Sequence, residues 1–287
     1  TSRSIGSRRQ HDIFYCLIRC GGRVPAYVLL AFVTLYYTLC RPSIRERTYP
    51  YLTKRFKGDS PYVMPFHCWR LYYNFGKALI DRAAIGIRGY GSLSHAFPAG
   101  QELLKVLGEG KGLVLLTSHV GCWQAVMPAL KFLNAPINLL VEQDREDIDI
   151  HYLEHGGEGF PCTIIDPTDY MAAVIEMIQA LKRSEVVCIM GDRMAGSPKG
   201  GVSVEFLGEK ALFPLGPFKI AAAMGAPVAV FLTHRSGLSE YTIAIPETIR
   251  PEGTKEALAA GVQRYVRALE AYTAEHPYQF FNFYNMW

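Results

Sequence analysis

The chain has 287 residues, 49% of them hydrophobic, so it can bury a sizeable core and is plausible as one domain. Its seven cysteines are odd in number and lack C-x-x-C spacing, which argues against a disulfide framework or a cysteine zinc site and fits a reducing cytosolic setting. The net charge is only +4 and no RNA-binding aromatic motif is present, so we expect no nucleic-acid partner.

Residues 1–60 form a basic and apolar segment that we expect to associate with a membrane. Residues 1–57 contain eleven Lys and Arg and only two acidic residues, a net charge of +9, which leaves a net charge of −5 for the rest of the chain. The uncharged stretch 24–40 is at the lower limit of the about 17–25 residues that cross a bilayer. Pro25 and the internal Thr and Tyr residues favour a helix lying in the membrane surface over one that crosses it. The alternatives are a buried core helix and, less favoured because no cleavage-site pattern follows, a signal peptide.

Residues 61–287 alternate between helix and strand patterns. The expected helices are 68–86, 99–110, 123–133 apart from Pro128, a polar helix near 146–155, 169–183, 217–225 and 254–276. The expected strands are 112–118, 136–142, 162–166, 185–190, 202–207, 227–233 and an edge strand at 241–245. This order predicts an α/β domain whose mixed, largely parallel sheet is flanked by helices, with the N-terminal membrane-associating helical segment in front of it.

Two polar side chains directly follow expected strands. His119 comes after the strand at 112–118, and Asp192 comes after the strand at 185–190. Ligands of open α/β sheets bind at the carboxyl ends of the strands, so we expect these two residues to share one crevice. An imidazole accepts protons near neutral pH, which makes His119 a candidate general base. The alternative is a histidine that only caps or packs at the strand end.

Several familiar signatures are incomplete or weak. "GEGKG" at 108–112 lacks the early glycine and the Ser/Thr of a P-loop, and no G-x-S-x-G nucleophile elbow occurs. "HYLEH" at 151–155 matches H-x-x-E-H, in which two histidines of one helix bind zinc beside a glutamate base. Because acidic residues precede it and glycines follow it, a solvated helix is favoured there over the zinc site of a metallohydrolase.

Three blocks in chain order resemble the lipid A biosynthesis (lauroyl/myristoyl) acyltransferases. "HVGCWQ" at 119–124 is similar to their H-x-G-x-W-E form of the acyltransferase H-x-x-x-x-D/E block. Residues 186–233 resemble their Asp after an apolar strand, a Gly-rich loop, a V-x-F-x-G strand and a helix ending in G-A-P-V. The closing "HPYQFFNFYNMW" is similar to their P-x-Q-W/F ending. The ordered set covers roughly residues 10–287.

The resemblance implies acyl transfer from a thioester carrier to a hydroxyl or amine of a lipid, with His119 deprotonating the acceptor and no covalent acyl-enzyme. Arg193, Lys199 and the backbone N–H groups of the loop 196–201 are candidates to stabilise the oxyanion. No metal or organic cofactor is required. The residues expected to be catalytic are His119, Gln124, Asp192 and Arg193. Those expected to contact substrate are Gly121, Trp123, Glu142, Arg145, Gly200, Gly201 and Phe206.

Gln124 departs from the family pattern, which has an acid there to orient the histidine and stabilise its cationic form. An acid-to-amide change in a serine-protease triad costs about 10⁴-fold. Three outcomes stay open, in this order of preference: Gln124 orients His119 unaided, another carboxylate such as Glu142 or Asp192 substitutes, or activity is lost. Arg145 is the candidate for an arginine that the family carries after its second strand, although the local sequence aligns poorly.

The sequence therefore predicts a peripheral acyltransferase on the cytoplasmic face of the inner membrane. The expected donor is acyl carrier protein, because an acidic carrier suits the basic N-terminal surface, with acyl-CoA as second choice. The expected acceptor is a lipid or glycolipid. The opposing hypothesis is a non-catalytic lipid-binding protein that kept this fold and lost the acid at position 124.

Overall fold

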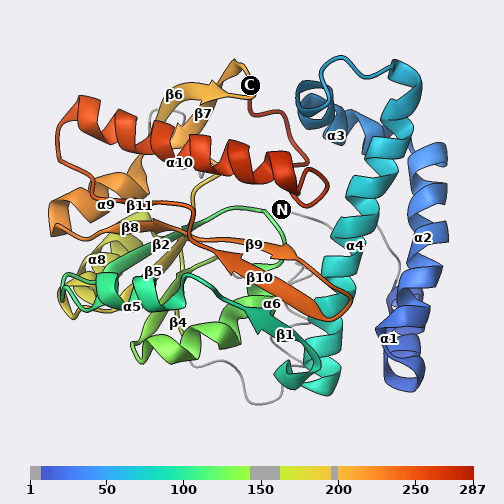
Figure 1. Cartoon of the computed structure of the whole chain (residues 1–287), viewed down its shortest axis with the longest axis horizontal. Helices are drawn as coiled ribbons and strands as arrows, with labels where there is room; N and C mark the ends of the chain where they lie inside the picture. Colours follow the sequence, from blue (N-terminus) through green and yellow to red (C-terminus); the bar gives the residue numbers. More distant parts are fainter. Residues whose placement is uncertain (1–7, 143–161, 195–199) are drawn as a thin grey trace.

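The computed structural model describes residues 8–142, 162–194 and 200–287. The chain begins with three helices, α1 (Arg8–Gly21), α2 (Arg23–Cys40) and α3 (Pro42–Arg55), packed on the long helix α4 (Met64–Arg88). In Figure 1, α4 stands between α2 and the sheets. Gly76 of α4 permits the close approach of α2, because an added Cβ would lie 2.6 Å from Leu30.

Helix α2 has one buried and one exposed face. Its inner face, which packs toward α4, contains Ala26, Tyr27, Leu30, Thr34 and Thr38. The two threonine hydroxyls donate to the carbonyls of the residues four positions earlier, so burying them leaves no donor unpaired. Within the described residues, α2 is the one helix long and apolar enough to cross a membrane, a criterion that core helices and signal sequences also meet.

The central sheet has the strand order β11-β8-β2-β5-β3-β4. Its strands are β2 (Leu113–Thr117), β3 (Ile137–Leu140), β4 (Thr163–Ile165), β5 (Val186–Met190), β8 (Val228–Val230) and β11 (Thr248–Ile249). All neighbours are parallel except β11, which is antiparallel to β8. Strand β2 is buried throughout, in keeping with an apolar strand covered on both faces. The predicted α/β class with a partly parallel sheet is confirmed.

Helices α8 (Tyr170–Lys182), α9 (Gly216–Met224) and α10 (Lys255–Glu275) pack in a row, with α8 on β3–β5, α9 on β2 and α10 on β11. Asp169 caps α8 and Thr254 caps α10, each by accepting a backbone N–H in the first turn. Helix α5 (Gly100–Leu107) ends before Gly108. The helices expected at 99–110, 169–183, 217–225 and 254–276 are therefore confirmed, and the one at 68–86 extends further at both ends.

The remaining strands form two smaller sheets. One has the order β1-β10-β9, with β1 (Ser94–Ala96), β10 (Glu240–Ala244) and β9 (Leu232–Arg235). The other is the hairpin of β6 (Gly201–Phe206) and β7 (Glu209–Pro214), which reverses at Leu207 and Gly208, both with positive φ. Three short 3₁₀ helices are also present: η1 (Pro61–Val63), η2 (Tyr90–Ser92) and η3 (Met127–Leu133).

Three expectations about these elements are wrong in detail. The run 227–233 is divided between β8 and β9, which belong to different sheets. The strand expected at 241–245 is the middle strand of its sheet and not an edge, because the three-residue β1 pairs with its free side. The helix expected over 123–133 shortens to α6 (Trp123–Val126) followed by η3, because Pro128 has no N–H to continue the α-helix. The helix expected near 146–155 lies outside the described residues.

Candidate active site

The loop that carries His119, residues 118–122, follows β2 and is held by two other parts of the chain. The C-terminal segment binds its backbone, because Gly121 N donates to Gln279 O at 2.8 Å and Phe281 N donates to His119 O at 2.7 Å. Strand β9 adds a bond from Thr233 Oγ1 to Val120 O at 3.0 Å. The loop therefore has a defined backbone position although it belongs to no helix or extended strand.

Gly121 is required by this close packing. Its φ of +65° is in the left-handed region, and an added Cβ would lie 2.3 Å from the carbonyl oxygen of Thr233. The sequence motif placed Gly121 among the substrate contacts, and the structure gives it a backbone role.

We expect Gly121→Ala to lower the free energy of unfolding by about 2–4 kcal/mol, from left-handed strain plus overpacking against β9. Gly225→Ala is the matched control, since Gly225 has a φ of +62° and an added Cβ would have no atom within 4 Å, so only about 1–2 kcal/mol of strain is expected. Urea unfolding of both variants measures the difference. Equal losses would show that the contact with Thr233 is relaxed at little cost.

His119 and Asp192 are in direct contact. They follow the neighbouring parallel strands β2 and β5, and His119 Nδ1 lies 2.9 Å from both carboxylate oxygens of Asp192. The backbone N–H of His119 also donates to Asp192 Oδ2 at 3.1 Å. The Asp192 side chain is 1% exposed, whereas that of His119 is 26% exposed. The carboxylate is thus buried beneath an imidazole whose outer edge reaches solvent.

The electrostatics of Asp192 favour its ionised form. Burial alone would raise the pKa of this carboxyl, but the charge and hydrogen bonds of His119, together with the charge of Arg193, lower the pKa below its ordinary value. An ionised Asp192 accepts the Nδ1–H of His119. That tautomer leaves the lone pair of Nε2 free to accept a proton from a bound molecule.

Arg193 lies against the C-terminal segment. Its Nη2 donates to Phe281 O at 3.1 Å, and its guanidinium carbon lies 5.4 Å from the ring centroid of Tyr284. The hydroxyl of Tyr284 in turn donates to the backbone carbonyl of Asp192 at 2.9 Å. The segment 279–284 therefore contacts both members of the histidine–aspartate pair through their backbones.

The other expected site residues are more scattered. Gln124 is buried on α6, where its Oε1 accepts a weak bond from the Cys122 thiol at 3.7 Å, and Trp123 is half-buried against the core. Glu142 is exposed beyond β3, two strand spacings from β2, on the order of 10 Å. Phe206 is fully buried, stacked on Trp287.

Gly200 and Gly201 lie at the start of the β6–β7 hairpin, where Gly200 O accepts from Leu215 N. Arg145, Lys199 and the H-x-x-E-H match at 151–155 lie outside the described residues. Within the described part of the chain, no group of three or more His, Cys, Asp or Glu side chains is arranged to hold a metal ion.

Sequence reasoning missed Gln279 and Phe281, which bind the loop of His119, and Tyr284, which binds the backbone of Asp192. The resemblance of the chain's ending to a P-x-Q-W/F element was the available signal, but nothing in the pattern indicated that this ending contacts the loop after β2. Thr233 of β9 carried no signal at all.

The chain matches a family model described as bacterial lipid A biosynthesis acyltransferase. The match covers residues 71–287, which include His119, Asp192 and the C-terminal segment. The match begins within α4, so α1–α3 lie outside it. No curated protein matches the chain.

Proposed function

The chain belongs to the bacterial lipid A biosynthesis acyltransferase family and is therefore an acyltransferase, and from this premise we propose its donor, its acceptor and its general base. The protein moves a fatty acyl chain from acyl carrier protein, or from acyl-CoA, to a hydroxyl or amine of a lipid or glycolipid. His119 acts as the general base, oriented by Asp192.

The contact between His119 Nδ1 and the buried Asp192 carboxylate is the observation that carries the proposal. A neutral hydroxyl is a poor nucleophile, so a base within hydrogen-bond reach must take its proton as it attacks the thioester carbonyl. Nε2 accepts that proton while the new C–O bond forms. The tetrahedral intermediate then collapses, the C–S bond breaks, and the imidazolium returns the proton to the leaving sulfur. Ester and thiol are the products, and His119 is restored.

Asp192 fills the role that the family usually gives to the acid at position 124. An ionised partner at Nδ1 both selects the tautomer and stabilises the imidazolium that forms during the reaction. Gln124 can do neither through a charge. Of the three outcomes that the sequence leaves open, substitution by another carboxylate is the one that this geometry supports.

Arg193 is the proposed source of positive charge beside the pair. Its guanidinium is held by Phe281 O and the Tyr284 ring, so the charge keeps a defined place near Asp192. In the proposed reaction this charge stabilises the oxyanion of the tetrahedral intermediate.

The proposed location is peripheral, on the cytoplasmic face of the inner membrane. Helix α2 supports this placement, because its outward face carries large exposed apolar side chains while the opposite face packs inside the protein. The exposed residues are Val24, Val28, Phe32, Leu35, Tyr36 and Leu39. Arg19 and Arg41 are exposed, precede and follow α2 in the chain, and favour anionic headgroups. A helix with one face already docked suits the membrane surface better than its interior.

The test is transfer of a radiolabelled lauroyl chain to a lipid A precursor presented in anionic vesicles, with lauroyl-acyl carrier protein and lauroyl-CoA as separate donors. We expect a labelled acylated lipid by thin-layer chromatography, formed faster from the carrier protein. Transfer from neither donor, with the precursor or with a total bacterial lipid extract as acceptor, would favour the non-catalytic lipid-binding hypothesis that Gln124 motivates.

A further inference from the structure

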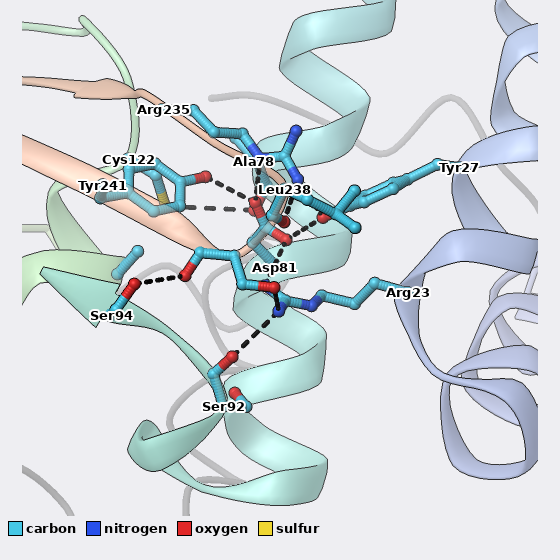
Figure 2. Close-up of polar contacts among 12 residues, drawn as sticks. Arg23, Tyr27, Ala78, Asp81, Ser92, Ser94, Cys122, Arg235, Leu238 and Tyr241 are labelled. Atoms are coloured by element: carbon cyan, nitrogen blue, oxygen red, sulfur yellow. Dashed lines mark hydrogen bonds and ion pairs between the residues drawn. The ribbon is translucent and has the colours of Figure 1, made fainter.

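A charged cluster that the proposed chemistry does not use lies where helices α2 and α4 meet strands β9 and β10 (Figure 2). Asp81 of α4 is completely buried, and both of its carboxylate oxygens are occupied. Oδ1 accepts from Arg23 Nη1 at 3.3 Å and from the hydroxyl of Tyr27. Oδ2 accepts from Arg235 Nε at 3.1 Å and from the hydroxyl of Tyr241 at 2.7 Å. The cluster thus joins α2, α4, β9 and β10 at one carboxylate.

The two tyrosines of the cluster act as neutral donors. Burial first, and the nearby Asp81 charge second, raise the pKa of Tyr27 and of Tyr241 above the ordinary value. A buried group of one carboxylate and two guanidinium ions pays a large desolvation cost, which apolar residues of similar size would avoid. The cluster is therefore expected to fix the relative positions of its four elements, and not to add much net stability.

One line of contacts runs from this cluster to the loop of His119. Arg235, whose side chain binds Asp81, has its backbone N–H bonded to Gln279 Oε1 at 2.8 Å, and its carbonyl accepts from Gln279 Nε2 at 3.2 Å. The carbonyl of Gln279 accepts the N–H of Gly121, two residues after His119. Gln279 therefore links β9 to the loop, because its side chain binds Arg235 of β9 and its backbone carbonyl binds Gly121 of the loop.

A second contact reaches the same loop. The thiol of Cys122 lies 4.0 Å from the carbonyl of Ala78, one turn before Asp81 on α4. Figure 2 shows Cys122 beside the ring of Tyr241 at the edge of the cluster. The C-terminal end of the loop, Gly121 and Cys122, thus contacts Gln279, which is bonded to Arg235 of the cluster, and α4, which carries Asp81.

We propose that Gln279 is a positioning residue for His119, and that the Asp81 cluster anchors it through Arg235. This inference rests on the proposed function of His119 as general base. Gln279 touches no reacting atom, and it acts by fixing the backbone of 119–121 so that the imidazole stays aligned with Asp192 and with the acceptor. A displacement of about 1 Å in such an alignment costs on the order of 10²-fold in rate.

The chain offers a matched control for Gln279. Gln263 of α10 makes the same pair of bonds to one strand residue: its Oε1 accepts from Glu205 N at 3.0 Å, and its Nε2 donates to Glu205 O at 3.0 Å. Both glutamines are half-buried. Methionine has a similar length and no amide, so Gln279→Met and Gln263→Met remove equivalent bonds from different places.

We expect both variants to lose a similar, small amount of stability in urea unfolding. Only Gln279→Met should lower kcat for lauroyl transfer, by about 10–100-fold, while KM for the donor changes less than about threefold. Equal kcat in the two variants would overturn the inference, even if His119→Ala remained inactive. Turnover by His119→Ala would instead remove the proposed function itself, whatever Gln279 does.

The anchoring step is tested by combining Gln279→Met with Tyr27→Phe. The Tyr27 hydroxyl donates to Asp81 and accepts from Arg235 Nη2 at 2.8 Å, so removing it loosens the cluster without removing a charge. If the cluster acts through Gln279, Tyr27→Phe lowers kcat in the wild-type background and lowers it less when Gln279 is already replaced. Additive effects on log kcat would overturn the anchoring role.

Discussion

Replacing His119 by alanine is expected to lower kcat for lauroyl transfer by about 10²–10⁴-fold, the usual contribution of a positioned general base. KM for the acyl donor should change little, because the imidazole acts on the proton of the acceptor and not on the acyl chain. Steady-state kinetics with lauroyl-acyl carrier protein and the lipid A precursor in vesicles measure both constants.

Folding must be separated from chemistry in this variant. Asp192 keeps the backbone N–H of residue 119 but loses the Nδ1 donor, so we expect a stability loss of about 1–2 kcal/mol at neutral pH. The circular dichroism spectrum should be unchanged, and added imidazole should restore part of the rate by occupying the space of the lost ring. A folded alanine variant with wild-type turnover would remove His119 from the mechanism.

The local sequence pattern was sufficient to predict the two strands that carry this site. The apolar runs before His119 and Asp192 identified β2 and β5, and the rule that parallel strands end at one edge brought the two side chains to the same place. Their contact needs the further fact that β2 and β5 are neighbours in the sheet. Strand order depends on packing between distant segments, which no periodicity reports.

The same limitation explains why Gln124 was preferred to Asp192 as the partner of His119. A spacing of five residues is visible in a sequence, whereas a partner 73 residues away is visible only after the sheet has formed. The division of 227–233 between β8 and β9 was hidden for a related reason. Residues 228–232 are all apolar and contain no Gly or Pro where β8 ends, so the change of sheet shows only in the hydrogen-bond partners.

The C-terminal segment was recognisable but not interpretable. Its glutamine and aromatic residues resembled a family ending, yet the contacts that give Gln279 and Phe281 importance are to a loop about 160 residues earlier. The Asp81 cluster had no sequence signal, because its members come from four separate elements, α2, α4, β9 and β10.

Asp192→Asn is expected to lower kcat by about 10²–10⁴-fold, similar to the loss of the acid in a serine-protease triad. Asparagine keeps the size of the side chain but presents an N–H that competes for Nδ1 and favours the tautomer with its proton on Nε2, where the acceptor must be deprotonated. It also removes the charge that stabilises the imidazolium.

The pH dependence of stability tests whether the Asp192 carboxylate is charged in the folded protein. The pKa of Asp192 is lowered by folding, so its carboxylate stabilises the fold at pH values above the ordinary aspartate pKa of about 4. That stabilisation is lost as the pH falls through the lowered pKa of the folded protein. Asp192→Asn should lack that part of the acid-induced loss.

Gln124→Glu decides between the two carboxylate positions. If Asp192 already orients His119, a new acid on α6 is redundant. In the protein that keeps Asp192, Gln124→Glu should then change kcat by less than about threefold. In Asp192→Asn, the same substitution restores activity only if a carboxylate at 124 can reach Nδ1. Lauroyl transfer by the single and double variants measures this coupling. Activity that appears only when Gln124 is replaced, with Asp192 intact, would mean that the natural chain has lost catalysis and that the buried pair is a structural remnant.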